Sequence, residues 1–425
     1  MKRTARVSLV AAVFALAAAA GCKKVEEGAP SAKSTSGAEP ATPTLKADKG
    51  VDVAKKVIRI GMLNDESGPG AGIGKPYAVG KRVLAAQINA GGSGLLPEGW
   101  TVELVEKDHG YSPQKSVEHY NAIKEDVLFI GTSFGTPNTK PLIDSLKGDK
   151  MVAFPASLES EMAEHENTPP FGPSYKIEAM RAMDFIVEKT GDAAKVKAAV
   201  VYQSDDYGKD GLNGFKAAAD KLGIKLVAEE AIAPAQADFT TIVKTLKAKG
   251  AEYVLIMALP KQTAGILGTS DAMGYKPVYI GNTPSWVDVY FSDKVLPPKY
   301  LENFYWVTGL TYWNEEVPGM KAFVAAFDKL KPEGATPNFY TMASYAQGLA
   351  AIEAAKRAIE ANDITRAGYL AALHQVAGWY GNGLFKAISI KAVPYTVSTK
   401  TRILKPVLDK GTWEQVSPYA DPKSL

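Results

Sequence analysis

A run of glycines and small hydroxyl residues, Gly131-Thr132-Ser133-Phe134-Gly135-Thr136, is the stretch best equipped for chemistry. It follows an apolar run, 127–130, that predicts a short buried strand, and Pro137 stands where a helix would begin. A strand that ends in such a turn and leads into a helix leaves backbone N–H groups free. Those donors and the hydroxyls favour an anionic ligand group. An ordinary turn of a parallel sheet fits the same residues.

A second polar turn follows the next predicted strand. Residues 150–154 are strand-like, and Pro155-Ala156-Ser157-Leu158 comes directly after them. Ligands bind at the carboxyl edge of open α/β sheets, where two such turns would meet. The pair of turns therefore predicts a ligand site that includes the hydroxyls of Ser133 and Ser157.

The first turn also fits a nucleophile motif, because Gly131 to Gly135 reads Gly-x-Ser-x-Gly between a strand and a helix. A hydrolase would also need an acid and a later histidine, and His374 is available. The main hypothesis is a binding protein without enzymatic activity. The alternative is a secreted serine hydrolase that uses Ser133.

No metal or cofactor is expected. The four histidines, at positions 109, 119, 165 and 374, lack metal-ligand spacing, and the chain has one cysteine. The glycine-rich stretch 68–75 fails as a phosphate loop, because Pro76 stands where Ser or Thr is needed.

Composition places the chain among ordinary globular proteins. It has 425 residues, of which 46% are hydrophobic and 22% charged, and size alone predicts two or three domains of about 150 residues. A formal net charge of +3 is too small to favour nucleic acid as a partner.

The N-terminus has the pattern of a targeting segment. Basic residues at positions 2, 3 and 6 precede an apolar stretch, 7–20, that is too short for a usual membrane span. It ends in Ala19-Ala20-Gly21-Cys22, which resembles the lipobox of bacterial lipoproteins. That resemblance implies a signal peptide over 1–21 and acylation of Cys22. Residues 22–56, rich in Ala, Pro, Ser, Thr, Gly and Lys, are expected to be a disordered tether.

The remainder predicts an α/β fold. A buried-strand pattern at 57–63 opens the folded body, and strands and helices then alternate as far as residue 308. Such alternation predicts parallel, doubly wound sheets, and the run is too long for one open sheet. Two similar α/β lobes are therefore expected, with the strand-rich tail after Phe385 completing the second.

The order of motifs resembles the periplasmic substrate-binding proteins of ABC importers, of the leucine/isoleucine/valine-binding type. The resemblance extends from Val57 to the C-terminus. It rests on these segments: Ile60-Gly61 with Ser67-Gly68-Pro69, Gly80 to Asn89 with Gly91-Gly92, Asp108 with Ser112-Pro113-Gln114, Ile130-Gly131, Pro155-Ala156-Ser157, Tyr207-Gly208 and Asp238-Phe239.

This resemblance implies two Rossmann-like lobes joined by three crossovers, with the ligand in the cleft between them. Lobe one would comprise 57–176 plus 309–383, and lobe two 177–308 plus 384–425. Hinge closure would trap the ligand. The implied protein is a monomeric lipoprotein on the extracytoplasmic side of the cell envelope that delivers a small molecule to the membrane subunits of an ABC importer. A ligand sensor or lipid carrier on the same fold stays an alternative.

Site residues follow from the resemblance by position. The two first-lobe turns of the family hold a ligand carboxylate, and the matching residues here are Gly135 and Thr136 in one turn and Ala156 and Leu158 in the other. A second-lobe tyrosine that contacts the ligand corresponds to Tyr207.

Three family positions are not matched. Its first-loop tyrosine falls near Ile73, its second-lobe tyrosine near Leu259, and the acid that meets the α-ammonium near Thr283. An unpaired buried ammonium is costly, so a ligand without one is expected, unless Asp205 or Asp206 supplies the charge. The apolar body of the ligand would lie between Ile73, Leu259 and Trp286. The ring of Trp286 is the candidate for stacking on the ligand, and a place in the core is the alternative for this ring.

Overall fold

The computed structural model describes residues 44–425, so Cys22 and the predicted signal peptide lie outside the described residues. Ordered structure begins earlier than the expected tether boundary at residue 56. Strand β1 (Lys46–Ala47) pairs with β12 (Asp363–Ile364), and β2 (Val51–Asp52) pairs with the first long strand. Backbone pairing of this kind orders a segment whose side chains alone could not bury enough surface.

A small sheet of five strands forms one half of the described body. Its parallel strands lie in the order β4-β3-β5-β6, and the short β2 runs antiparallel to β3. They are β3 (Val57–Asn64), β4 (Thr101–Asp108), β5 (Phe129–Phe134) and β6 (Ala153–Ala156).

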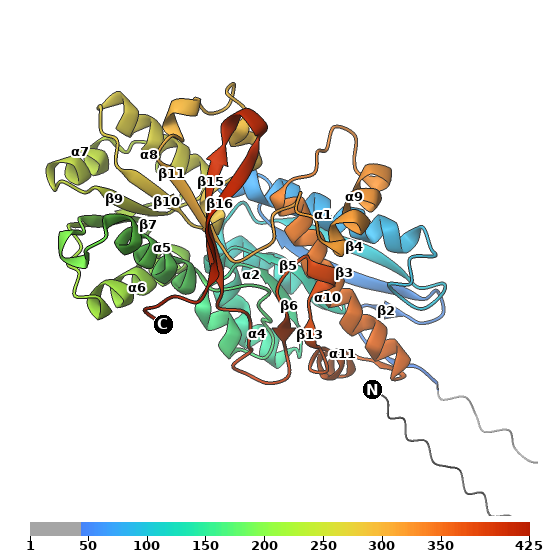
Figure 1. Ribbon diagram of the computed structural model, residues 1–425. Coiled ribbons are helices and arrows are strands. Elements are labelled where there is room, and N and C mark those ends of the chain that lie inside the picture. Colours follow the sequence, from blue (N-terminus) through green and yellow to red (C-terminus); the bar gives the residue numbers. More distant parts are fainter. Residues whose placement is uncertain (1–43) are drawn as a thin grey trace, which may run out of the picture. The chain divides into compact units, whose positions relative to one another are not determined.

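A large sheet of seven strands forms the other half (Figure 1). Its five parallel strands lie in the order β8-β7-β9-β10-β11, which has the same permutation as the small sheet. Two antiparallel strands from the C-terminal tail, β15 and β16, extend the sheet beyond β11. The seven are β7 (Ala198–Gln203), β8 (Ala228–Ile232), β9 (Tyr253–Met257), β10 (Val278–Gly281), β11 (Phe304–Thr308), β15 (Thr401–Val407) and β16 (Thr412–Ala420).

In each sheet the strand order reverses once, between β3 and β5 and between β7 and β9. Chain connections leave such a switch point in opposite directions, which opens a crevice at the carboxyl ends of the strands. The expected α/β class with largely parallel sheets is therefore confirmed.

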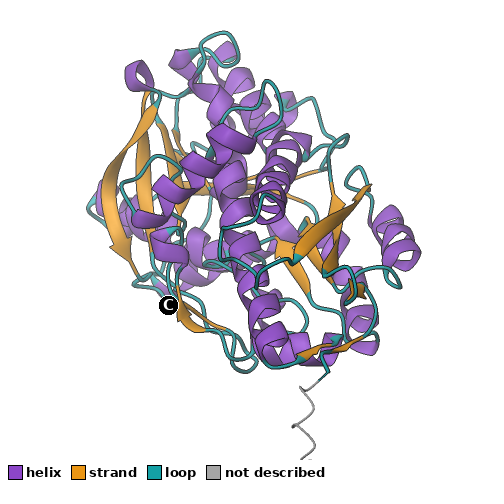
Figure 2. Cartoon of the chain, turned by 90° about the vertical axis from the view of Figure 1, so that its right-hand side faces the viewer, coloured by secondary structure: helices purple, strands orange, loops and turns teal. Residues whose placement is uncertain are grey.

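Helices flank the strands of both sheets (Figure 2). Helix α1 packs against α9 and α10, and α10 packs against α11; α5 packs against α6, β11 and β15. The α-helices are α1 (Ala71–Asn89), α2 (Pro113–Ile123), α3 (Thr136–Thr139), α4 (Ile143–Gly148), α5 (Tyr175–Thr190), α6 (Asp206–Lys221), α7 (Thr240–Ala248), α8 (Pro260–Ala272), α9 (Pro318–Leu330), α10 (Phe339–Glu360) and α11 (Arg366–Leu373). Within residues 44–425, no helix is long and apolar enough to cross a bilayer.

Local boundaries differ from the expectations at three places that matter. Strand β5 runs on through Phe134, so Ser133 lies inside a strand rather than in a turn. Helix α1 begins at Ala71, which places Ile73 in its first turn instead of in a loop. The expected tail strand near residue 388 is only β14 (Ile388–Ser389), which pairs with β13 (Ala377–Trp379) apart from the large sheet.

Candidate ligand-binding site

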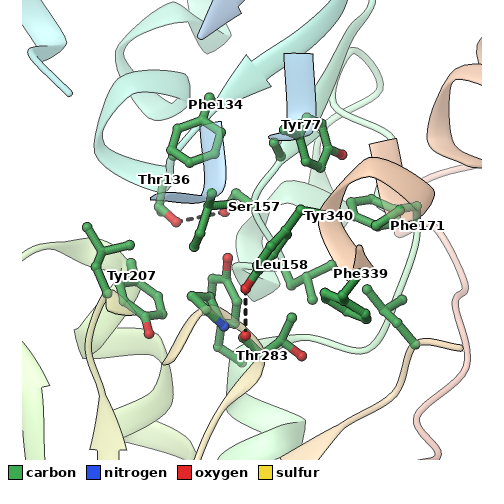
Figure 3. Close-up of a pocket in the computed structure, with 18 of the residues that line it drawn as sticks. Tyr77, Phe134, Thr136, Ser157, Leu158, Phe171, Tyr207, Thr283, Phe339 and Tyr340 are labelled. Carbon is green, nitrogen blue, oxygen red and sulfur yellow. Dashed lines mark hydrogen bonds between the residues drawn. The ribbon is translucent and has the colours of Figure 1, made fainter. Parts of the chain in front are cut away.

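A cavity lies where the carboxyl ends of strands from both sheets meet. The small sheet contributes the turns after β5 and β6, and the large sheet contributes residues after β7, β9 and β10. Helices α1 and α10 close the remaining sides (Figure 3). The space within the cavity and its open mouth together is about 560 Å³. Its lining is Ile73, Tyr77, Tyr111, Phe134, Gly135, Thr136, Ala156, Ser157, Leu158, Phe171, Tyr175, Tyr207, Leu259, Thr283, Pro284, Leu310, Phe339, Tyr340 and Ala343.

Most of the site residues expected from the sequence meet at this cavity. Nine of them line it: Ile73, Gly135, Thr136, Ala156, Ser157, Leu158, Tyr207, Leu259 and Thr283. These nine residues come from six separate segments of the chain, which the fold brings together around one cavity. Ser133 and Trp286 do not line the cavity.

Ser133 is fully buried within β5, and its Oγ lies 2.8 Å from Oγ1 of Thr139. Because side chains alternate along a strand, Ser133 points to the opposite face of β5 from Phe134, which lines the cavity. The geometry lacks the exposed nucleophile and adjacent histidine of a hydrolase. His374 instead lies 3.0 Å from the hydroxyl of Tyr395.

Trp286 is fully buried in an aromatic cluster, where its ring packs against Tyr290, Phe291, Phe304 and Trp413. Its indole N–H donates to Asp288 at 2.9 Å. The expected stacking of this ring on a ligand is therefore replaced by a core role.

The two turns form the polar end of the cavity. The hydroxyls of Thr136 and Ser157 lie 2.7 Å apart, drawn as a dashed line in Figure 3. Whichever hydroxyl donates, the other keeps its hydrogen for a further acceptor. Gly135 shapes the first turn with a φ of +85°, and a Cβ there would meet Asn138 and the ring of Tyr111. These turns can hold a carboxylate with hydroxyl donors.

Thr283 separates a buried carboxyl group from the cavity. Its backbone N–H donates to Oε2 of Glu178 at 3.1 Å, and its hydroxyl donates to Oε1. Glu178 is fully buried, and burial raises the pKa of its carboxyl to about 8. The acid nearest to the family's ammonium-binding position is thus already satisfied by Thr283 and does not line the cavity.

Four further tyrosines line the cavity and were missed in the sequence: Tyr77, Tyr111, Tyr175 and Tyr340. Burial raises the pKa of each, so all are neutral phenols. The hydroxyl of Tyr340 donates to the carbonyl oxygens of Thr283 and Trp286, at 2.8 and 3.0 Å. Two of them, Tyr175 and Tyr340, stand at the start of a helix capped by the side chain of a preceding residue, which is a signal that the sequence carries.

The lining includes no aspartate, glutamate, lysine, arginine or histidine. Elsewhere in residues 44–425, no cluster of histidine, cysteine and acidic residues could hold a metal ion. Two largely parallel sheets of matching strand order, with a largely apolar cavity at their carboxyl edges, have the architecture of a small-solute binding protein.

Comparison with known proteins agrees with this class. Residues 57–405 match the periplasmic binding protein family, and the chain belongs to that family. An amino acid binding protein of Pseudomonas aeruginosa is 25% identical over 315 residues, which cover 73% of this chain and 81% of that protein.

Solved structures share the fold. A fatty acid ABC transporter substrate-binding protein from Thermomonospora curvata has a TM-score of 0.82 and 24% identity, covering 89% of this chain and 96% of that one. A branched chain amino acid ABC transporter protein from Thermus thermophilus, with bound valine, has a TM-score of 0.76 and 19% identity, covering 87% and 98%.

Proposed function

We propose that this chain is the extracytoplasmic receptor of an ABC importer, and that its ligand is a small, largely apolar carboxylate without an α-ammonium group. The uncharged lining of the cavity carries this proposal. An α-amino acid would place its ammonium beside tyrosines, Thr283 and aliphatic groups, with no carboxylate to meet it. A buried charge in that position costs several kcal/mol.

The shape of the site supports a ligand with two ends. Its carboxylate would accept a hydrogen bond where the two turns meet, at the hydroxyls of Thr136 and Ser157. Its apolar body would lie against Ile73, Leu158 and Leu259, where burial contributes roughly 25 cal/mol per Å² of apolar area. A fatty acid, for which the Thermomonospora curvata protein is named, fits this distribution, whereas valine, bound in the Thermus thermophilus structure, does not.

Asp205 does not replace the missing acid. It caps α6 by accepting from Gly208 N–H at 3.3 Å, and its other carboxylate oxygen accepts from Gln203. Burial raises the pKa of the Asp205 carboxyl, and neither it nor Asp206 lines the cavity.

We propose further that lobe one comprises 57–176 plus 309–383, that lobe two comprises 177–308 plus 384–425, and that they close over the ligand. The small sheet draws all its strands from residues before 157, whereas the large sheet draws its strands from 198–308 and 401–420. The packing of α9 and α10 on α1 supports assigning the intervening helices to lobe one.

A matched pair of ligands tests the proposed class. Isocaproate is leucine without its α-amino group, so calorimetry with both compounds isolates the effect of the ammonium. We expect isocaproate to bind at least about tenfold more tightly than leucine, a difference of about 1.4 kcal/mol or more. Valine against isovalerate, with octanoate and benzoate alongside, extends the comparison. Tighter binding of leucine or valine than of the matching acid would refute the proposed class.

A further inference from the structure

A buried lysine lies directly behind the cavity wall. Lys81, in the middle of α1, is 5% exposed, and its Nζ donates to the carbonyl oxygen of Ser344 at 2.8 Å and to Oε1 of Gln347 at 3.0 Å. No carboxylate in residues 44–425 forms an ion pair with it. Lysines are almost never buried without an acidic partner, because desolvation of the charge is costly.

Close helix packing creates this position. A Cβ on Gly80 would come within 2.2 Å of the carbonyl oxygen of Thr341 in α10, and a Cβ on Gly348 would come within 3.2 Å of the Lys81 side chain. The two glycines let α1 and α10 approach each other, and the approach covers Lys81.

Hydrogen bonds link Lys81 to the polar end of the cavity. Oε1 of Gln347 accepts from both Lys81 and the hydroxyl of Tyr77, the latter at 2.9 Å. Nε2 of Gln347 donates to the carbonyl oxygen of Pro155 at 2.7 Å, two residues before Ser157. Nζ also lies 5.3 Å from the centre of the Tyr77 ring, which lines the cavity. One layer of side chains therefore separates the amine from a bound ligand.

The partners of Lys81 fit an amine whose charge depends on the ligand. A neutral amine has two N–H groups, and both find acceptors in Ser344 and Gln347. An ammonium has a third N–H, for which the described residues provide no further acceptor. Burial accordingly lowers the pKa of Lys81 well below its ordinary value. A carboxylate in the cavity would stabilise the ammonium, because Coulomb attraction is strong where water is excluded.

We propose that Lys81 is the positioning residue that makes the site selective for an anion: it supplies the counter-charge to the ligand carboxylate across Tyr77 and Gln347. On this view the site prefers a monoanion to its neutral analogue, and binding takes up a proton at Nζ. The inference rests on the proposed function, since it assumes that a carboxylate occupies the cavity.

Other titratable groups must be separated from this effect. Tyr77 on the same helix and Tyr175 across the cavity are neutral phenols, α10 presents Ser344 and Gln347, and the sheet presents apolar Ile60 and Phe129. Around the cavity, Glu178 and Glu159 have pKa values raised by burial to about 8 and about 7. Either carboxyl group can also take up a proton when an anion binds.

Calorimetry with isocaproate and its amide, isocaproamide, tests the inference on the full chain. Octanoate and octanamide serve as a second acid and amide pair. Wild type, Lys81→Met and Lys115→Met are compared at neutral pH in two buffers of different ionisation enthalpy, which reports the protons taken up. Lys115→Met removes the same charge from an exposed position on α2.

We expect Lys81→Met to weaken binding of the acids by about tenfold or more, to leave amide binding unchanged and to abolish most proton uptake. Lys115→Met should match wild type. The inference is overturned if Lys81→Met keeps the wild-type preference for the acid and its proton uptake. If Lys81→Met does not fold, the wild-type protein still tests the inference, because equal wild-type affinity for the acid and its amide would also overturn it. Tighter binding of leucine than of isocaproate would instead overturn the proposed function, and binding of none of these compounds would overturn both.

Discussion

Two serines that the sequence marked as equivalent have different positions in the structure. The Ser157 hydroxyl faces the cavity and bonds Thr136, whereas the Ser133 hydroxyl is fully buried and bonds Thr139. Removing either hydroxyl deletes a short bond to a threonine hydroxyl, and removing that of Ser157 also deletes a longer bond, at 3.3 Å, from the backbone N–H of Glu159. Only the first deletion changes the surface that a ligand would touch.

Ser157→Ala is therefore expected to weaken isocaproate binding by about 0.5–1.5 kcal/mol, the net value of one hydrogen bond, because Thr136 still donates. Ser133→Ala should leave binding unchanged and lower the free energy of unfolding by a similar amount. Calorimetry and urea unfolding on both variants measure the two effects. Equal losses of affinity in the two variants would contradict the placement of Ser133.

Glu178 makes stability depend on pH. Its pKa of about 8 in the fold exceeds the ordinary value of 4.5, so the native state holds a proton that the unfolded state releases between these values. Its contribution is fully present below about pH 4.5 and is lost as pH rises towards 8.

Glu178→Gln keeps one acceptor oxygen for the backbone N–H of Thr283, its amide can donate to the Thr283 hydroxyl, and it cannot ionise. We expect the variant to gain stability relative to wild type as pH rises from about 5 to about 7.5, by up to about 1.4 kcal/mol per pH unit. Urea unfolding at both pH values gives the difference, and Glu159 contributes equally to both proteins. A difference that stays constant with pH would show that Glu178 is ionised in the native state.

At the scale of elements, the helices after β6 and β7 are joined through one acidic side chain. Asp210 in α6 accepts from the backbone N–H of Ser160 at 3.2 Å and from its hydroxyl. Ser160 begins a short 3-10 helix, η2 (Ser160–Glu164), that follows the small sheet. Neither residue lines the cavity, so in the proposed closure of the lobes this contact would join them without touching the ligand.

Ser160→Ala removes the hydroxyl half of this contact. A hydrogen bond to a charged group contributes about 1.5–3 kcal/mol, so we expect isocaproate to dissociate about tenfold faster while its association rate is unchanged. Stopped-flow fluorescence measures both rates. Ser112→Ala, which removes the capping hydroxyl of α2, serves as the control. Unchanged dissociation would show that this contact does not limit opening.

Local pattern predicted the elements and the turns, but not the whole cavity wall. The alternation of strands and helices predicted the parallel sheets. Gly135 and Ser157 were predicted as site residues because they stand in turns that directly follow strands in the sequence. Tyr77 was missed because its partner Gln347 lies 270 residues away, on a helix whose packing no local pattern reveals. Trp286 was misplaced because an aromatic residue after a strand fits a core as well as a binding site.

At the scale of the whole molecule, the resemblance of residues 19–22 to a lipobox predicts that an acylated Cys22 holds the folded body at a membrane. Cys22→Ala should release the body from membranes into the soluble fraction, and fractionation followed by immunoblotting measures it. Sedimentation of a normally processed Cys22→Ala protein with membranes would refute the anchor.

The path of the chain between the two sheets has a consequence for biosynthesis. The large sheet begins with β7 but lacks β15 and β16 until residues 401–420 have been made, after α9, α10 and α11. Pairing of strands so distant in sequence is slow, because a long loop must close first. We therefore expect the nascent chain to stay incompletely folded until translation is nearly finished. A polypeptide in that state can still be threaded through a secretion channel, so the discontinuous sheet would favour export before folding.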